Sequence, residues 1–216
     1  MQLFDLQYFG SIESISTLIN QSNNYFSAST RWKKDCLLNR TWVAGSNNLI
    51  SLSVPLEGGR AVNLPYRDIR IAYAEPWQRV HWRTLHDCYR KAPWFEQFAG
   101  SLEMLFQSKV NWLVEWNQMC LYWALRSIGL NSVNMAEIEV VVPEFNLQLV
   151  SKKPLLQVPN GYPRYHQVFE DRVGFIGNLS IVDLVFCEGP AAVSYLQKIA
   201  VCINNNQNTF LTDEIH

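Results

Sequence analysis

The N-terminal third of the chain carries apolar residues in strand-like alternation around one helix-like segment. Residues Gln2–Phe9 alternate loosely and predict a strand that ends at Gly10. The segment 11–20 repeats its isoleucines at helical spacing, with Ser11 as its expected N-cap. A short strand is expected at Tyr25–Ala28. The chain therefore opens as strand, turn, helix and strand.

The next segment predicts a β-hairpin. Runs rich in β-branched and apolar residues, Thr41–Ala44 and Leu49–Val54, flank a four-residue polar break at 45–48. A further strand is expected at Arg67–Tyr73.

Three helices follow, because the apolar spacing changes to about three and a half residues. They are expected at Trp77–Arg90, Trp94–Phe106 and Asn111–Ile128. The third is apolar on several sides, which predicts a central buried helix, and Gly129 is suited to end it.

The C-terminal part mixes strand-like and helix-like runs. We expect strands at Ile138–Val142 and Tyr165–Phe169, a proline-rich loop at Lys152–Arg164 suited to cover a cleft, and helices at Ser180–Phe186 and Pro190–Ile203. Together these elements predict a single α/β domain over residues 1–204, with a mixed β-sheet and packed helices, and α+β as the alternative. Residues 205–216 are expected to be a polar, frayed tail.

Composition narrows the function classes. The 216 residues carry a net charge of −1, so we expect no binding to nucleic acid. No apolar run is long enough for a membrane helix, and the start lacks the basic region of a signal peptide, so we expect no membrane insertion. Five cysteines without a CxxC pair fit reduced thiols in the cytoplasm. Eight Trp, nine Tyr and eleven Phe fit a large core, an aromatic binding groove or a homo-oligomer contact.

A basic segment, KKDCLLNR, contains the first candidate site. If it is extended, Lys34 and Arg40 lie on one face with Asn39 nearby, and two cations beside an amide would suit a carboxylate or phosphate. A solvated basic edge is the alternative.

The second candidate is His81, which shares a helical stripe with Trp77 and Leu85. An imidazole on an apolar face can act as a general acid or base, or it can be a core histidine with a backbone hydrogen bond. Tyr89 lies near the same face two turns later.

The third candidate is a set of polar residues in an apolar run: Tyr165, Gln167, Asn178, Ser180 and Asp183. Buried polar groups need partners, so these are structural hydrogen-bonding groups or a binding site. Ser180 with Asp183 three residues later also fits a helix capping box, which would explain both without any function.

The chain contains no glycine-rich phosphate loop, no GxSxG and no HExxH motif. The spacing of histidines, cysteines and carboxylates recommends no metal site, and no cofactor can be read from the sequence.

Four blocks resemble the WbqC-like family of bacterial proteins: YFGSI, KKDCLLNR with LSVPL, HWRTLHDCYRKAPWF, and YHQVF…GFIGNLSIVDLVFCEGP. Their order holds from Tyr8 to Leu196. The chain departs from the family pattern after the YF pair, where Ser11, Ser14 and Ile15 replace a proline and aromatics, and at Leu38, where an arginine is usual.

The resemblance implies a role in lipopolysaccharide O-antigen synthesis, with a sugar or nucleotide sugar as the substrate. Transfer of an acyl or aminoacyl group to an amino sugar is the implied reaction, and a non-catalytic sugar-binding or assembly protein with an aromatic groove is the alternative. We expect His81 as the acid or base, oriented by Asp183, while Lys34 and Arg40 hold an anionic donor. The positions carried over are Lys34, Asn39, Arg40, His81, Tyr89, Tyr165, Gln167, Asn178, Ser180 and Asp183.

Overall fold

The computed structural model describes residues 3–21, 24–26, 28–29, 37–59, 64–130, 135–137 and 153–213. The elements in chain order are β1 (Leu3–Phe4), α1 (Ile12–Ile19), β2 (Asn24–Phe26), β3 (Arg40–Ala44), β4 (Leu49–Ser53), the 3-10 turn η2 (Tyr66–Asp68), α2 (Trp77–Tyr89), α3 (Phe95–Gln107), α4 (Leu113–Ser127), β5 (Met135–Glu137), α5 (Glu170–Val173), α6 (Ile181–Glu188), η3 (Gly189–Ala191) and α7 (Ala192–Asp213).

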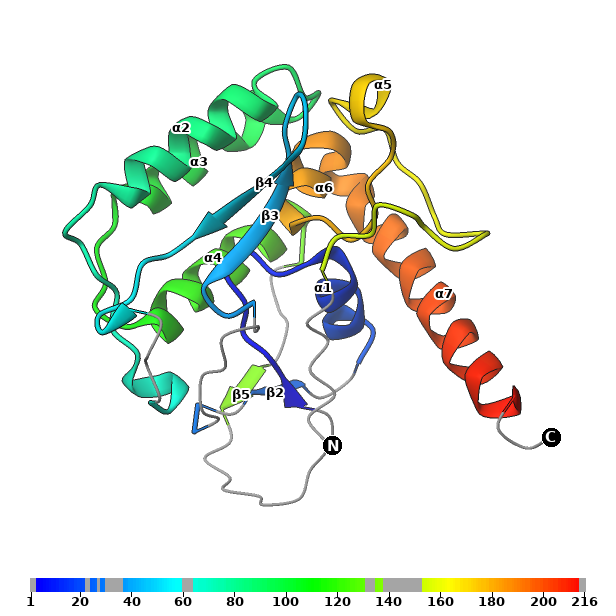
Figure 1. The fold of residues 1–216 in the computed structure, drawn as a ribbon, viewed down its shortest axis with the longest axis horizontal. Helices are drawn as coiled ribbons and strands as arrows, with labels where there is room; N and C mark the ends of the chain where they lie inside the picture. Colours follow the sequence, from blue (N-terminus) through cyan, green and yellow to red (C-terminus); the bar gives the residue numbers. More distant parts are fainter. Residues whose placement is uncertain are drawn as a thin grey trace.

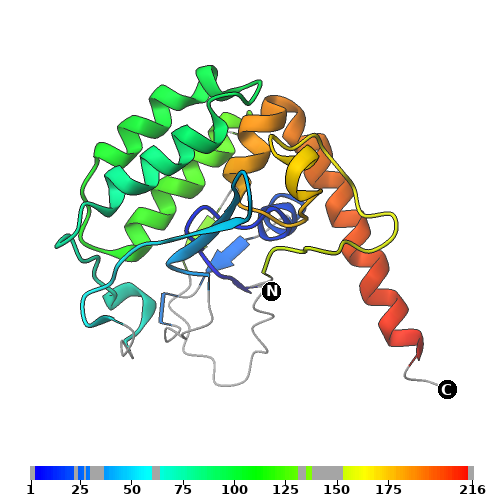
Figure 2. The same cartoon turned by 45° about the horizontal axis from the view of Figure 1, so that its top comes forward.

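The strands form two small sheets within a mixed α/β domain, which confirms the fold class. β1, β2 and β5 pair in parallel in that order, and β3 pairs with β4 in an antiparallel hairpin. α2, α3 and α4 pack together in that order, and α6 and α7 lie to the right of them in both views (Figures 1 and 2). α6 links α4 to the hairpin, since it packs against both α4 and β3.

The hairpin was predicted correctly, with Ala44 opposite Leu49 across the turn. The strand expected at Gln2–Phe9 is shorter, because the chain turns at Tyr8 and Phe9 after β1. The strand expected at Arg67–Tyr73 is wrong, since this segment begins in η2 and then makes only isolated bridges.

The strand expected at Tyr165–Phe169 is also wrong. Gln167 uses its side-chain amide in place of a strand's backbone: Nε2 donates to the Ile176 carbonyl at 2.7 Å, and Oε1 accepts from the Ile176 N–H at 2.9 Å. The chain then enters α5 at Glu170. The strand expected at Ile138–Val142 lies outside the described residues, directly after β5.

The helices follow the predicted spacing closely. α4 is the central buried helix, with Trp116, Cys120 and Ala124 fully inaccessible to solvent. α7 packs along α1, where the Ser16 hydroxyl donates to the Leu196 carbonyl at 2.6 Å. It then continues past the rest of the fold to Asp213, so the segment expected to be a frayed tail is helical for most of its length (Figure 1).

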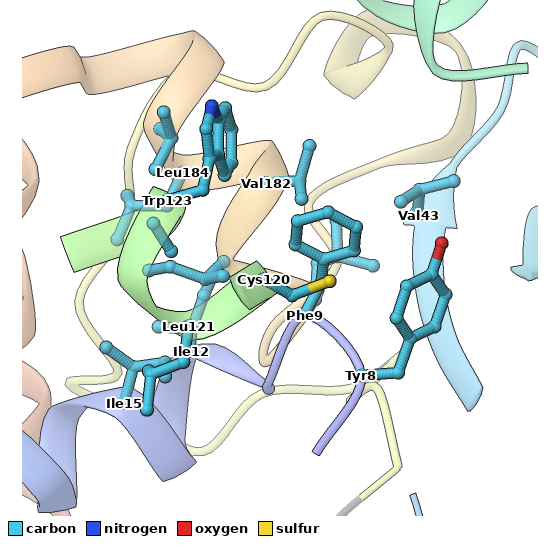
Figure 3. Packing of buried hydrophobic residues seen from close by; sticks show 14 of the residues in the cluster. Tyr8, Phe9, Ile12, Ile15, Val43, Cys120, Leu121, Trp123, Val182 and Leu184 are labelled. Atoms are coloured by element: carbon cyan, nitrogen blue, oxygen red, sulfur yellow. The ribbon is translucent and has the colours of Figure 1, made fainter. Parts of the chain in front are cut away.

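The core between α4, α6 and the N-terminal turn combines aromatic and aliphatic side chains. Phe9 points into this cluster beside Cys120 and Val182, whereas the Tyr8 side chain leaves the turn near Val43 on β3 (Figure 3). The ring of Phe9 meets Trp123 edge-on, with centroids 5.7 Å apart. None of the helices in the described ranges is long and apolar enough to cross a membrane.

Gly189 provides a test of how α6 and η3 pack against Trp94. Its φ of 53° lies where side chains are strained, and an added Cβ would overlap the Trp94 indole. We expect Gly189→Ala to lower the free energy of unfolding by roughly 2–4 kcal/mol, through backbone strain and overpacking. Denaturant unfolding measures the change.

Gly100 is the matched control, because it lies inside α3 with nothing within 4 Å of an added Cβ. Gly100→Ala should raise stability by about 0.5–1 kcal/mol. Equal effects of the two substitutions would contradict the packing described for Gly189.

Candidate functional site

A strained turn lies at the centre of the molecule. Phe9 is fully buried and has a φ of 39°, which is unusual for a bulky side chain. Its carbonyl oxygen accepts hydrogen bonds from Thr41 Oγ1 and Ser180 Oγ, both at 3.0 Å. These bonds tie the turn to β3 and to the start of α6, so two distant parts of the sequence hold it in place.

Backbone bonds extend the same interlock to the neighbouring residues. The Ile181 N–H donates to the Gly10 carbonyl, and the Ile12 N–H donates to the Leu179 carbonyl, each at 2.9 Å. Asn178 has a φ of 55°, and its Oδ1 accepts from the Glu13 N–H at 2.9 Å, inside the first turn of α1. The beginnings of α1 and α6 are therefore capped by one another's loops.

Tyr8, on this turn, forms a buried pair with His81 of α2. The Tyr8 hydroxyl lies 2.9 Å from His81 Nδ1. Burial lowers the pKa of His81 to about 4, and burial raises the pKa of Tyr8 well above its ordinary value. At neutral pH the imidazole is uncharged and the phenol keeps its proton. Because a phenol can both donate and accept, either neutral tautomer of His81 satisfies this bond.

Aromatic rings enclose His81 on the other side. Trp77 meets the imidazole edge-on with centroids 5.2 Å apart, and Trp77 in turn meets Trp116 of α4 at 5.3 Å. These apolar surroundings, together with a partner that carries no charge, explain why protonation of His81 is unfavourable.

Asp183 lies in a second buried cluster. The Tyr89 hydroxyl donates to one carboxyl oxygen and the Tyr165 hydroxyl to the other, both at 2.6 Å, while Cys187 Sγ lies 3.8 Å away. Burial raises the pKa of Asp183, and the hydroxyl donors oppose that rise. The hydrogen bond of His81 Nδ1 goes to Tyr8, and both Asp183 oxygens accept from tyrosines; no hydrogen bond between His81 and Asp183 is present among the described residues.

The capping-box interpretation is half right. Ser180 is the N-cap of α6 and accepts from the Val182 N–H at 3.3 Å. The Asp183 side chain does not return to the cap, because Tyr89 and Tyr165 occupy both of its oxygens.

The other predicted polar residues bind backbone or lie at the surface. Asn39 Nδ2 donates to the Val54 carbonyl at 2.9 Å, beside the β3–β4 hairpin. Arg40 is exposed and its Nε donates to Ser53 Oγ at 3.0 Å. Lys34 lies outside the described residues. The structure thus joins Tyr89, Tyr165 and Asp183, while His81 and Arg40 belong to separate environments.

Sequence reasoning missed Tyr8 and Asn117 as organising residues. Asn117 Nδ2, fully buried on α4, lies 2.8 Å from the Leu6 carbonyl and 2.6 Å from the Leu38 carbonyl. It therefore fixes the segment before Tyr8 and the segment before Asn39. The sequence signal that could have identified Asn117 was an amide side chain within a helix that is apolar on most sides. Among the described residues, no cluster of His, Cys, Asp and Glu could hold a metal ion.

The buried imidazole predicts a pH-dependent stability. The folded-state pKa of His81, about 4, lies below the ordinary value of 6.5, so its contribution is present above pH 6.5 and is lost as pH falls toward 4. The loss reaches about 3 kcal/mol. The stability difference between wild type and His81→Gln, from denaturant titrations at several pH values, should shrink over this range. A difference that stays constant would contradict the buried neutral imidazole.

The Asp183 cluster predicts equal importance for two tyrosines that are distant in sequence. Tyr89→Phe and Tyr165→Phe each remove one hydroxyl donor from the carboxyl group, and each should cost about 1.5–3 kcal/mol of unfolding free energy. Tyr122→Phe is the control, because Tyr122 is 55% exposed on α4. Wild-type stability in either cluster variant would show that the hydrogen bonds are not formed.

Comparison with known proteins gives one match. No curated protein and no solved structure is found to match the chain. One family model, for the WbqC-like protein family, matches residues 6–153, which include Tyr8, Asn39, His81 and Tyr89. The match ends before the Tyr165–Asp183 segment, so it is shorter than the Tyr8–Leu196 span of the resemblance. The match covers more than half of the chain, which therefore belongs to the WbqC-like protein family.

Proposed function

We propose that this chain acts in the cytoplasm in the synthesis of bacterial cell-surface polysaccharide such as lipopolysaccharide O-antigen, on a sugar or nucleotide sugar. Family membership motivates this role, and the matched segment contains both Tyr8 and His81. The reaction we propose is transfer of an acyl or aminoacyl group to an amino sugar. His81 is its acid or base.

The Tyr8–His81 hydrogen bond is the observation that carries this proposal. In this reaction the amine nitrogen attacks the carbonyl carbon of the acyl donor and loses a proton as the C–N bond forms. The bond between that carbon and the rest of the donor breaks, and the rest of the donor departs as the leaving group. An imidazole that is neutral at the working pH, with Nδ1 fixed by Tyr8 at 2.9 Å, has Nε2 left for that proton. Tyr8 then takes the orienting role first expected of Asp183. The strained turn at Phe9 supports the same interpretation, since such backbone conformations cluster at functional sites.

Arg40 and Lys34 keep their proposed role as the holders of an anionic donor. Arg40 has the exposure this role needs, and among the described residues its side chain has one hydrogen bond, to Ser53. Tyr89, Tyr165 and Asp183 act in this proposal through the placement of α2 and α6 and do not touch the substrate.

A second candidate function is sugar binding without turnover. It is favoured because several side chains predicted to bind substrate instead form hydrogen bonds to backbone groups of the fold: Asn39, Gln167, Asn178 and Ser180. In this case His81 is a core histidine whose Tyr8 partner satisfies it.

Substitution of His81 separates the two candidates. Purified protein is mixed with nucleotide-activated amino sugars and acyl or aminoacyl donors, and the product is followed by mass spectrometry. His81→Gln should lower turnover by at least about 100-fold, the usual contribution of a general acid or base. Circular dichroism should show that the variant remains folded.

His86→Gln is the matched control, because His86 is exposed on the same helix. Full activity of His81→Gln would refute the catalytic role. A wild-type protein that binds sugars without product formation would favour the second candidate.

A further inference from the structure

A cavity of about 540 Å³ opens where α2 begins and α3 ends, the left-hand end of these helices in Figure 1. Residues 73–79, before and at the start of α2, line it together with Trp82 and with Glu103, Phe106, Gln107 and Lys109 at and just after the end of α3. Its volume falls within the range of small-molecule sites. None of the site residues predicted from the sequence lines this cavity. All of its residues lie within the segment matched by the family model.

Four aromatic rings line this cavity. Trp77 and Phe106 are buried, whereas Tyr73 and Trp82 are only partly buried. Tyr73 lies 6.0 Å from Trp77 and Trp82 lies 6.5 Å from Phe106, measured between ring centroids. Such a lining suits a ligand with apolar C–H faces, because ring faces stack on them with little loss of conformational freedom.

Polar groups at the cavity are arranged beside these rings. Trp82 Nε1 donates to Glu103 Oε1 at 3.1 Å, which holds the carboxylate next to the indole and leaves its second oxygen for a ligand. The side chains of Glu75, Arg79 and Gln107 form no hydrogen bond or ion pair among the described residues. A ligand with several hydroxyl groups could therefore use them without breaking protein contacts.

We propose that this cavity binds the pyranose ring of an amino sugar, with the ring's C–H face on Trp82 and its ammonium group at Glu103. This inference rests on the proposed function, from which it takes the amino sugar, and it assigns a binding subsite for that sugar separate from the point of proton transfer at His81. The rim also carries Arg79 and Lys109, so its charge is mixed. The carboxylate that Trp82 holds in place is the group that distinguishes an amine from a hydroxyl.

The cavity also connects to His81 through one shared wall. Trp77 lines the cavity and contacts the imidazole edge-on at 5.2 Å. Its Nε1 is a buried donor without a hydrogen-bond partner among the described residues. The Trp77 indole separates a sugar bound here from the imidazole, so the cavity is a binding subsite and proton transfer at His81 takes place outside it.

Binding of glucosamine and glucose to the intact protein tests this inference. Titration calorimetry at low salt should give glucosamine at least tenfold tighter binding than glucose. Glu103→Gln should abolish that preference, and Glu96→Gln, a substitution at an exposed glutamate on the same helix outside the cavity, should retain it. Equal affinity for the two sugars, or an unchanged preference in Glu103→Gln, overturns the proposal.

Aromatic substitutions test the position of the sugar ring. Trp82→Ala should weaken glucosamine binding at least tenfold, while Tyr122→Ala, at an exposed aromatic outside the cavity, leaves it unchanged. If Trp82→Ala unfolds, Trp82→Phe keeps a ring but loses the bond to Glu103, so the preference over glucose should fall. Wild-type binding in the folded Trp82 variant overturns the proposal.

His81→Gln distinguishes failure of this inference from failure of the proposed function. Glucosamine binding should persist in that variant, because His81 does not line the cavity. Lost binding in folded His81→Gln would contradict the separate subsite. Persistent binding with normal turnover would instead remove the catalytic role and leave the subsite intact.

Discussion

The carbonyl oxygen of Phe9 is the point on which the rest of this structure depends. It accepts hydrogen bonds from the hydroxyl groups of Thr41 and Ser180, residues that lie 32 and 171 positions further along the chain. These bonds compensate a backbone conformation that is costly for phenylalanine. The turn they stabilise sends Phe9 into the core and Tyr8 toward Val43 of β3 (Figure 3). The Tyr8 hydroxyl there reaches His81 of α2.

Periodicity alone predicted much of the fold. The β3–β4 hairpin and helices α2, α3 and α4 follow from apolar spacing and turn residues, because the information for each lies within its own segment. One failure arises where a side chain replaces backbone pairing. Gln167 closes its own pair of hydrogen bonds with Ile176, so the run around it reads as a strand but is not one.

The site was harder to predict because its partners are distant in sequence. The spacing of Ser180 and Asp183 fits a capping box, and only the fold shows that Tyr89 and Tyr165 occupy the carboxyl group. Likewise, His81 on an apolar face indicated a buried imidazole, but nothing in its segment pointed to Tyr8, 73 residues earlier. Burial of polar residues could be predicted; the choice of partner could not.

The most direct test of this account is the protonation state of His81 followed by NMR of its imidazole nitrogens as pH is lowered. We expect a neutral ring that stays unprotonated until the pH approaches 4, with Nδ1 shifted by its hydrogen bond to Tyr8 and that shift lost in Tyr8→Phe. An imidazole that takes up its proton near pH 6.5, or is indifferent to Tyr8→Phe, would contradict the buried pair.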